Sequence, residues 1–242
     1  MTSVRGLNDP AHVQAQYATE AALAARKAVY RDVTGPDPRQ AAFAAVIAGG
    51  AASILEVGCG EGELAEQLVR ESGAAVVAID QSERMVELTR RRGVDAHVAD
   101  VQDLPFANGA FDAVLAAWML YHVSNLDLGL REIARVLTPG GRLVATTNAA
   151  DHLVELLELG GVERWDLPFG AESGEAQLRR HFDRVERVDL PGTVTFTGIE
   201  AIRSYFGSSE CFAPALDRLP TGLDEPLIAR RCPVLFVATK GR

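Results

Sequence analysis

Short apolar runs alternate with stretches of helical periodicity between residues 53 and 147, and this alternation constrains the fold more than any other feature. Short apolar runs bounded by turns are typical of buried strands, and strands that alternate with helices form a parallel sheet covered by helices. The sequence therefore predicts a doubly wound α/β fold. The expected strands lie at 54–57, 76–79, 96–99, 113–116 and 142–147, and the expected helices at 61–71, 82–92 and 125–137.

The segments on either side of this alternation have looser patterns. Two helices are expected at 8–33 and 39–48, separated by the breaker GPDP, because both stretches are rich in Ala with apolar residues at helical spacing. A length of 242 residues fits one domain. After residue 147 we expect helices at 151–159, 174–182 and 199–206, a pair of strands formed by 184–190 and 193–197, and a last strand at 233–240.

The charge balance argues against a nucleic-acid partner. The chain has 24 Lys and Arg residues against 33 Asp and Glu residues, which gives a net charge of −9 at pH 7. Nucleic-acid binders normally carry a basic stripe, because neutralised phosphates supply most of their affinity. The dense cationic clusters of this chain, at 90–92, 179–180 and 230–231, are each expected to be solvated helix ends.

The sequence also predicts no membrane span. The longest uncharged stretch, 41–55, is shorter than the roughly 20 apolar residues of a transmembrane helix, and two glycines interrupt it. The first residues lack an apolar signal segment, and the cysteines, Cys59, Cys211 and Cys232, share no metal-ligand spacing. We therefore expect a cytoplasmic protein with no membrane partner.

A glycine-rich loop follows the first expected strand. Gly58, Gly60 and Gly62 lie between this strand and the next helix, where glycines permit a tight turn and let a cofactor approach the backbone. The spacing is GxGxG, and Glu63 stands where a dinucleotide-binding GxGxxG loop has its third glycine. Carboxylates at Glu61 and Glu63 would sit badly beside a pyrophosphate, so the loop favours a cofactor without one. The alternative is a glycine turn with no ligand.

Acidic residues end the second and third expected strands. Asp80 lies 22 residues after Gly58, near the offset at which a carboxylate accepts hydrogen bonds from ribose hydroxyls in such folds. Its alternative role is to cap the helix that begins near Ser82. Because ligands bind beyond the carboxyl ends of parallel strands, Asp80, Asp100 and Ala117 are expected to converge with the glycine loop on one nucleoside pocket.

Five motifs in order resemble those of the class I S-adenosylmethionine-dependent methyltransferases, in the type 11 subgroup that includes the ubiquinone and menaquinone biosynthesis methyltransferases. They are LEVGCGEG, VVAIDQSERM, ADVQDLPF, FDAVLAAWMLYHV and REIARVLTPGGRLVATT. The resemblance covers roughly residues 12–155 and resumes at the last strand. It implies a Rossmann-like, mostly parallel sheet of seven strands in the order 3-2-1-4-5-7-6 with helices on both faces. It also implies S-adenosyl-L-methionine as the cofactor and S-adenosyl-L-homocysteine as the product.

The resemblance further assigns cofactor contacts. Gly58 and Gly60 would approach the amino-acid part of the cofactor, Asp80 would hold the ribose hydroxyls, and Asp100 would contact the adenine. Met85 would cover one adenine face, although a methionine at this helical spacing could equally belong to the core. The full set of expected cofactor residues is Tyr17, Arg26, Glu56, Gly58, Cys59, Gly60, Asp80, Gln81, Met85, Asp100, Val101 and Ala117.

The N-terminal stretch QYATEAALAAR resembles a segment that closes over the cofactor in related enzymes. It places Tyr17 and Arg26 nearest the cofactor carboxylate, for which a guanidinium is the expected partner. The alternative for Arg26 is a surface arginine on an amphipathic helix. Ala117 and Trp118 stand where related sequences often carry polar residues, which suggests a more apolar crevice, although Trp118 could be ordinary core.

Two histidines are candidates for a general base. His122 follows the fourth expected strand and His152 follows the fifth, and the reference pKa of histidine, about 6.5, suits proton removal from an acceptor. The alternative for His122, and equally for His152, is a buried histidine bonded to the backbone. Positioning alone can supply about 7 to 11 kcal/mol, so a base would help without being obligatory. Asn148 and Asp151 do not complete an oxygen-ligand set for Mg²⁺, and no metal is expected.

The acceptor site is expected to be built by the N-terminal helices and residues 148–231. We expect a small apolar or aromatic acceptor, methylated on O in preference to N or C, in secondary metabolism, and a protein that is a monomer or homodimer. The alternatives are an NAD-dependent oxidoreductase and a non-catalytic cofactor-binding protein. The aromatic residues available to enclose the acceptor are Trp165, Phe169, Phe196, Tyr205, Phe206 and Phe212, although ordinary core packing is the alternative for each of them.

The expected single domain, 1–242, comprises a helical cap (1–50), a cofactor-binding core (51–147), an acceptor-side elaboration (148–231) and the last strand (232–242).

Overall fold

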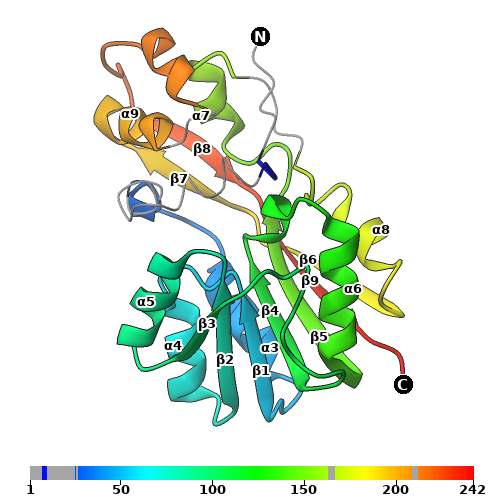
Figure 1. Ribbon diagram of the computed structural model, residues 1–242. Coiled ribbons are helices and arrows are strands. Elements are labelled where there is room, and N and C mark those ends of the chain that lie inside the picture. The colour runs from blue at the N-terminus through cyan, green and yellow to red at the C-terminus, as the bar shows by residue number, and fades with distance from the viewer. Residues whose placement is uncertain (1–6, 10–24, 26, 163–166, 209–211) are drawn as a thin grey trace.

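A mostly parallel sheet forms the centre of the molecule (Figure 1). The computed structural model describes residues 7–9, 25, 27–162, 167–208 and 212–242. Within these ranges the sheet has seven strands in the order β3-β2-β1-β4-β5-β9-β6, and its first five strands pair in parallel while β9 is antiparallel to both β5 and β6. Because β9 is the seventh strand of this sheet along the chain, the predicted fold and strand order are confirmed. The strands are β1 (Ser53–Val57), β2 (Ala75–Asp80), β3 (Asp95–Val98), β4 (Phe111–Ala117), β5 (Leu137–Asn148), β6 (Arg184–Asp189) and β9 (Pro233–Thr239).

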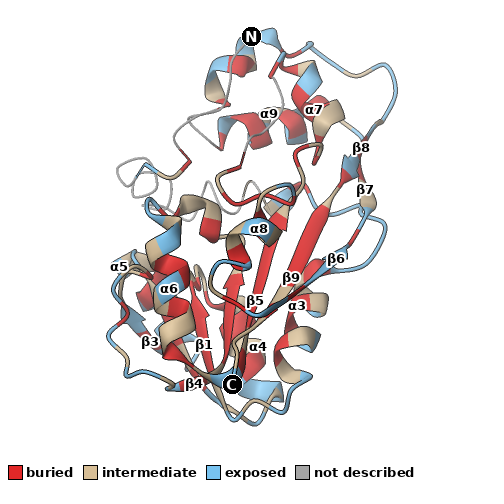
Figure 2. Cartoon of the chain, turned by 90° about the vertical axis from the view of Figure 1, so that its right-hand side faces the viewer, coloured by how far each residue is buried: buried red, intermediate tan, exposed pale blue. Residues whose placement is uncertain are grey.

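Helices cover both faces of this sheet. Successive strand residues point to opposite faces, so Ile54 packs with α3 (Pro38–Ile47) and α4 (Glu63–Glu71), whereas Leu55 packs in the cluster of α6 (Leu126–Val136). The helix α5 (Glu83–Arg91) packs on β2 and β3, and the short α8 (Gly174–Leu178) packs on β6 and β9. Figure 2 shows the buried strands between helices whose outer faces are partly exposed. Burial on both faces explains why the central strands β1 and β4 are apolar runs without alternation.

The start of α5 settles which residue caps this helix. Ser82 is the N-cap, and its hydroxyl accepts a hydrogen bond from the backbone N–H of Met85. Asp80 does not cap the helix. Its Oδ1 accepts instead from the backbone N–H of Ser82, at 2.9 Å. The carboxylate is therefore fixed at the end of β2.

A second, smaller unit lies beyond the carboxyl ends of the parallel strands (Figure 1). It has its own hydrophobic cluster, and Tyr121 packs against both this cluster and the cluster of the main sheet. The elements of this unit are a two-stranded sheet of β7 (Gly192–Phe196) and β8 (Leu227–Arg231), the helices α7 (Val154–Leu159) and α9 (Ile199–Gly207), and the 3₁₀ helix η2 (Ala213–Arg218).

The expected strand pair at 184–190 and 193–197 is wrong. The first strand, β6, pairs with β9, and the second, β7, pairs with β8. The two pairs form one long antiparallel ribbon that passes from the main sheet to the small sheet, with Pro191 at the passage on one strand and Cys232 on the other. Proline cannot donate to a ladder, so it favours an interruption at this point.

Strand β8 was also missed by the sequence interpretation, which assigned 230–231 to a solvated helix end. Both arginines lie on β8, where Arg230 is exposed and Arg231 is buried. The other two clusters do lie at helix ends, at the termini of α5 and α8. The expected helix at 8–33 falls largely outside the described residues, and its last residue, Val33, forms a β-bridge with Val194.

Candidate functional site

A cavity of about 630 Å³ lies between the carboxyl ends of the parallel strands and the smaller unit. Parallel sheets bind ligands at this edge, and the volume falls in the range of about 300 to 1,000 Å³ that is typical of small-molecule sites. Ten of the residues expected from the sequence line the cavity: Glu56, Gly58, Cys59, Gly60, Asp80, Gln81, Val101, Ala117, His122 and His152.

The glycine loop after β1 bends back over the end of β2. The backbone N–H groups of Gly58 and Cys59 both donate to the carbonyl of Ile79, at 2.8 and 3.0 Å. Gly58 has a φ of +68°, and a Cβ atom there would lie 2.7 Å from the Cβ of Met119. Gly60 also has a positive φ, +54°, but a Cβ atom there would meet nothing within 4 Å. The first glycine is therefore required for packing, whereas the second borders open space in the cavity.

Asp80 is held at the end of β2 by two backbone N–H groups. Its Oδ2 accepts from Gly60 at 2.9 Å, and its Oδ1 accepts from Ser82 at 2.9 Å. Burial raises the pKa of Asp80, and these backbone hydrogen bonds act in the opposite direction. Each carboxylate oxygen has a further lone pair, so the group can accept two more hydrogen bonds from a ligand with adjacent hydroxyls.

Glu56 is a buried carboxyl group without a full set of partners. The side chain lines the cavity and is 2% exposed, and its Oε2 has no hydrogen-bond partner in the part of the chain that the structure describes. Burial, together with the negative charge of Asp80, raises the pKa of Glu56 to about 8, against the weaker effects of the Ala65 N–H and Arg39. A cationic ligand group would satisfy this carboxyl group and favour its ionised form.

The raised pKa of Glu56 predicts a pH-dependent effect of the substitution Glu56→Gln. Between pH 4.5 and about 8 the folded protein keeps a proton that the unfolded chain has lost, so the unfolding free energy of the wild type falls as the pH rises. The fall is at most about 1.4 kcal/mol per pH unit. Glutamine does not titrate, so Glu56→Gln should gain stability relative to the wild type across this range. Urea unfolding of both proteins at several pH values measures the difference, and parallel profiles would contradict the prediction.

The adenine contacts expected from the sequence are only partly brought together. Val101 lines the main cavity, while Asp100 lines a neighbouring recess of about 340 Å³ that shares Gln81 and His122 with it. Met85 lines neither space and is fully buried. The expected contact of Met85 with a ligand is therefore corrected: Met85 lies on the buried face of α5.

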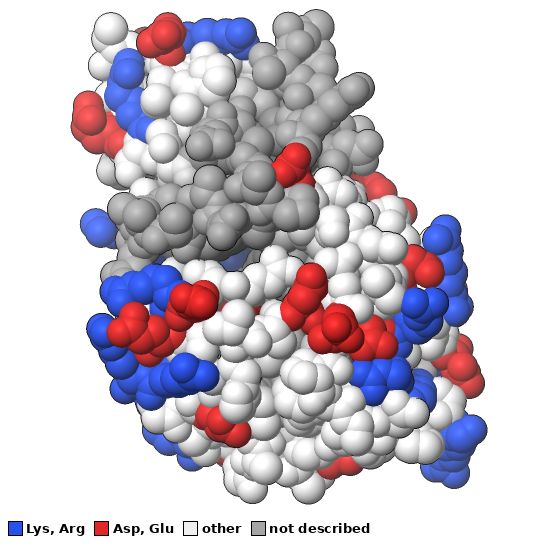
Figure 3. Space-filling view, viewed as in Figure 1, with Lys and Arg blue, Asp and Glu red and all other residues white. Residues whose placement is uncertain are grey.

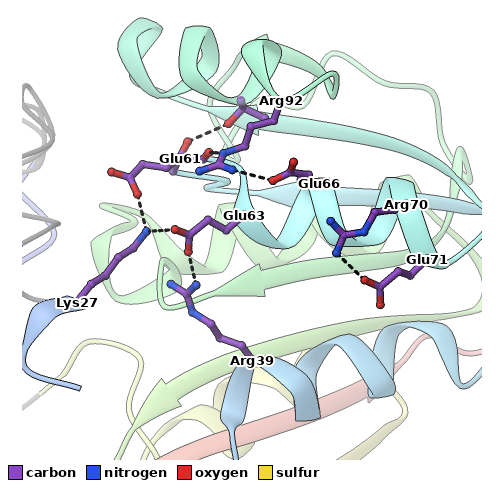
Figure 4. A network of polar contacts seen from close by, with 10 residues as sticks. Lys27, Arg39, Glu61, Glu63, Glu66, Arg70, Glu71 and Arg92 are labelled. Atoms are coloured by element: carbon purple, nitrogen blue, oxygen red, sulfur yellow. Dashed lines mark hydrogen bonds and ion pairs between the residues drawn. The ribbon is translucent and has the colours of Figure 1, made fainter. Parts of the chain in front are cut away.

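Salt bridges join the glycine loop to segments before β1 (Figure 4). Lys27 Nζ lies 2.5 Å from Glu61 and 2.9 Å from Glu63, and Arg39 also pairs with Glu63. Burial alone would raise the pKa of Glu63, but hydrogen bonds from Arg39 and Lys27 outweigh it and lower the pKa to about 2. All four residues line the cavity. Sequence reasoning missed Lys27 and Arg39, because these pairings connect positions far apart in the chain.

The two candidate histidines have different hydrogen bonds. His152 is 7% exposed, and its Nδ1 accepts a hydrogen bond from the backbone N–H of Cys232 at 3.0 Å. In the neutral ring the proton is therefore on Nε2, which lies 3.0 Å from the Tyr30 hydroxyl. Burial, with a smaller effect of the charge on Arg231, lowers the pKa of His152 to about 3. His122 is half-buried, and its Nδ1 donates to the carbonyl of Leu7 at 2.7 Å. The neutral ring of His122 therefore has its lone pair on Nε2.

Trp118 has strained backbone at the edge of the cavity. Its φ is +53°, a conformation that costs a residue with a side chain about 1 to 2 kcal/mol. The backbone N–H donates to Thr146, and the indole Nε1 lies 3.4 Å from Asn148 Oδ1. Trp118 lines the cavity and is half-buried, so it is not ordinary core.

The aromatic residues expected around an acceptor divide into two groups. Tyr205 and Phe212 line the cavity and stack on each other with ring centroids 5.8 Å apart. Phe169, Phe196 and Phe206 are fully buried in the two hydrophobic clusters and do not line the cavity, so these three are ordinary core residues. Trp165, Tyr17, Arg26 and Cys211 lie outside the described residues.

Among the described residues, no group of three or more His, Cys, Asp or Glu side chains is arranged to hold a metal ion. A search of the same residues finds no helix with the length and apolar character needed to span a membrane.

Comparison with known proteins gives a consistent result for the centre of the chain. Residues 55–145 match the family model described as a methyltransferase domain. The chain is 40% identical over 98 residues to methyltransferase GfsG of Streptomyces halstedii, covering 37% of this chain and 35% of that protein. It is 42% identical over 103 residues to a ubiquinone biosynthesis O-methyltransferase of Xanthomonas oryzae, covering 40% and 43%. The chain thus spans less than half the length of these curated relatives.

A solved structure extends the likeness of fold to the whole chain. The crystal structure of the [4+2]-cyclase SpnF aligns with 100% of this chain and 99% of its own, with a TM-score of 0.62 and 19% sequence identity. At this identity the likeness concerns the fold alone. Residues 55–145 are a methyltransferase domain, and the chain around them has the class I methyltransferase fold. The expected resemblance to methyltransferases is thus confirmed for residues 55–145, and the match supports S-adenosylmethionine as the cofactor.

Proposed function

We propose that the chain is an S-adenosylmethionine-dependent methyltransferase that acts on a small molecule. The observation that supports this most directly is the placement of Asp80 and Glu56 on adjacent strands, facing one cavity beside the glycine loop. A fixed carboxylate suits a ribose diol, and a buried carboxyl group with an unpaired oxygen suits a cationic amino acid moiety. The residues present therefore fit this cofactor.

Each part of the cavity has a definite task in this proposal. Asp80 would accept hydrogen bonds from the ribose hydroxyls, Glu56 would compensate the positive charge, and Gly60 would let the ligand approach the backbone. Gln81, Val101 and Asp100 lie where the nucleobase would extend, in the cavity and its neighbouring recess. The cofactor, when bound, supplies a methyl group on a positively charged sulfur.

The main task of the protein in such a transfer is positioning. An in-line displacement requires the acceptor atom, the methyl carbon and the sulfur to be aligned, and positioning of this kind can supply about 7 to 11 kcal/mol. Ala117 at the end of β4 and Trp118 and Tyr121 after it line the cavity and provide an apolar wall for the acceptor. Tyr205 and Phe212 extend that wall from the smaller unit. This surface supports a small apolar or aromatic acceptor.

The hydrogen bonds of His152 argue against it as the general base and leave His122 as the candidate. A base needs an available lone pair, and the Nδ1 lone pair of His152 is used by Cys232 while its other nitrogen carries the proton. His122 also lines the cavity, and its Nδ1 donates to the carbonyl of Leu7, so the basic nitrogen of its neutral ring is Nε2. We therefore assign His152 to holding Tyr30, and His122 to accepting a proton from the acceptor.

Substitution by asparagine distinguishes these roles, because Asn can replace Nδ1 in each histidine. His122→Asn keeps a donor for Leu7 and should lower kcat roughly 10²- to 10⁴-fold, the usual contribution of a general base. His152→Asn keeps an acceptor for Cys232 and should mainly lower stability. The measurement is kcat against pH with an acceptor that the enzyme methylates. Unchanged turnover of both variants at every pH would remove the histidines from the mechanism.

The finer features of the function are proposals of the same kind. We favour methylation of oxygen over nitrogen or carbon, and secondary metabolism as the context, because the similar proteins include a ubiquinone biosynthesis O-methyltransferase and a Streptomyces methyltransferase. The net charge of −9 argues against a nucleic-acid substrate, and on the face shown in Figure 3 basic and acidic side chains lie next to one another. We also propose a cytoplasmic monomer or homodimer, without a metal, whose core and acceptor-side segments form one domain.

A thermal-shift experiment tests the cofactor, and a labelled-methyl screen tests the reaction. S-adenosylhomocysteine at 100 times its Kd should stabilise the protein by about 2.7 kcal/mol, whereas NADH should give no shift. A shift with NADH alone would favour an NAD-dependent oxidoreductase. Incubation with methyl-labelled S-adenosylmethionine and a panel of small phenols, acids and amines should then give a labelled product. Binding without any transfer would favour a non-catalytic cofactor-binding protein, or a chemistry other than methylation.

A further inference from the structure

Arg231 is a buried arginine in the wall of the cavity. It ends strand β8 and is 5% exposed. Its Nη2 donates to the carbonyl groups of Thr34 and Pro36, both at 2.8 Å. Its Nε is buried and has no hydrogen-bond partner in the part of the chain that the structure describes. The two carbonyl groups fix the guanidinium in place and leave donors unused.

The positive charge of Arg231 also lacks a counter-ion: no ion pair between described residues includes it. Its neighbour Arg230 differs in every respect, since it is exposed and pairs with Glu155 at 2.7 Å and Asp151 at 3.5 Å. A buried charge without a partner is unfavourable, and neutral carbonyl groups compensate it only in part. The nearby His152 ring is neutral, so it does not compensate the charge of Arg231. Arg231 is therefore suited to an anion that arrives with a ligand.

The position of Arg231 separates it from the acidic end of the cavity. Glu56 and Asp80 lie at the ends of β1 and β2, whereas Arg231 leads through Cys232 into β9, and β4 and β5 stand between these strands in the sheet. Among the other residues that line the cavity, Asn148 ends β5 and His152 follows it. Near the glycine loop the carboxylates of the lining, Glu56, Asp80, Glu61 and Glu63, outnumber the cations Lys27 and Arg39. At the β9 end the lining includes Arg231, with Asp37 next to its partner Pro36.

We propose that Arg231 binds a carboxylate of the methyl acceptor, so that the substrate is a small organic acid. This inference rests on the proposed methyltransferase function. The two carbonyl groups occupy Nη2, whereas Nη1 makes no hydrogen bond in the part of the chain that the structure describes. A guanidinium N–H in the lining of a cavity is a charge-assisted donor for a carboxylate. A cofactor carboxylate has the same chemistry, but the strands that carry the expected cofactor contacts are those at the acidic end. The charge division therefore favours the acceptor.

Matched acids and amides test the proposal on the wild-type protein. The probes are benzoate, 4-hydroxybenzoate and 2-naphthoate with their primary amides, titrated calorimetrically in the presence of saturating S-adenosylhomocysteine. At least one acid should bind 10-fold or more tightly than its amide, because each pair differs chiefly in the charge. If no acid exceeds its amide, the proposal is overturned. This arm does not depend on the folding of any variant.

Variants of the two adjacent arginines then locate the charge that is recognised. Arg231→Gln should remove the preference for the acid, Arg231→Lys should retain part of it, and Arg230→Gln, the matched control, should keep it in full. The affinity for S-adenosylhomocysteine should change less than 3-fold in all three. A loss of S-adenosylhomocysteine affinity in Arg231→Gln, with the acid preference kept, would assign Arg231 to the cofactor and overturn the proposal. Failure of the wild type to bind S-adenosylhomocysteine would instead contradict the proposed function.

Discussion

Asp80→Asn should weaken the binding of S-adenosylhomocysteine by about 10²- to 10⁴-fold, because two hydrogen bonds from ribose hydroxyls to a charged acceptor are worth about 1.5 to 3 kcal/mol each. Asparagine has the same size but presents an N–H₂ group in place of one oxygen. The backbone N–H groups of Gly60 and Ser82 each face one oxygen of Asp80, so the amide nitrogen must oppose one of them or rotate away. Either outcome disturbs the acceptor that the ribose needs. Isothermal titration measures the loss.

The stability of Asp80→Asn should change little, which separates a binding role from a structural one. Burial raises the pKa of Asp80, so replacing the carboxylate by a neutral group removes an unfavourable buried charge. We expect the free energy of unfolding to stay within about 1 kcal/mol of the wild type. Equal affinity of variant and wild type for S-adenosylhomocysteine would show that Asp80 does not contact the ligand.

Asp112 provides a matched control at the other end of the sheet. It lies near the start of β4, and its Oδ2 accepts from the backbone N–H groups of Ala52 and Ser53 and from the Ser53 hydroxyl, at 3.0 to 3.1 Å. Burial opposes ionisation there, but these hydrogen bonds outweigh it and lower the pKa of Asp112. Asp112→Asn should therefore lower stability at neutral pH, by about 1 kcal/mol at most because solvent screens this carboxylate, and leave ligand affinity unchanged. The two variants should thus differ chiefly in ligand affinity.

The contrast between Asp80 and Arg231 shows how far the sequence could predict the site. Asp80, Gly58 and Gly60 lie within a segment whose local pattern of strand, loop and helix already determines where they end. The partners of Arg231 are carbonyl groups of residues 34 and 36, which lie 197 and 195 positions away in the chain. Every residue has a backbone carbonyl group, so residue types do not reveal such a partner. Sequence reasoning therefore assigned this arginine to a solvated helix end. A buried position within β8 became visible only with the pairing of β7 and β8.

The fold was predicted best between residues 53 and 147, where parallel strands alternate regularly with helices. The central strands β1 and β4 are buried on both faces, so their composition alone indicates the sheet. In the ribbon that joins β6 and β7 to β9 and β8, the residues between strands β6 and β7 are only Leu190 and Pro191, a length that also suits a hairpin. Sequence periodicity does not distinguish a hairpin from a continuing ribbon. Met85 shows the same limit, since helical spacing allows both a core position and a ligand contact.

Gly60→Ala should abolish much of the affinity for S-adenosylhomocysteine although the added methyl group meets no protein atom. A Cβ atom at Gly60 would project into open space beside the cavity, where the ligand is proposed to approach the backbone. A clash of one methyl group with a tightly bound ligand costs about 1 to 3 kcal/mol, so the expected loss of affinity is roughly 10- to 100-fold.

Gly73 gives the matched control, because it also has a positive φ, +72°, and open space around its Cβ position, but it does not line the cavity. Both alanine variants should lose about 1 to 2 kcal/mol of stability from backbone strain. Denaturation and titration of the two variants together separate the contributions, and equal ligand affinities would contradict the close approach at Gly60.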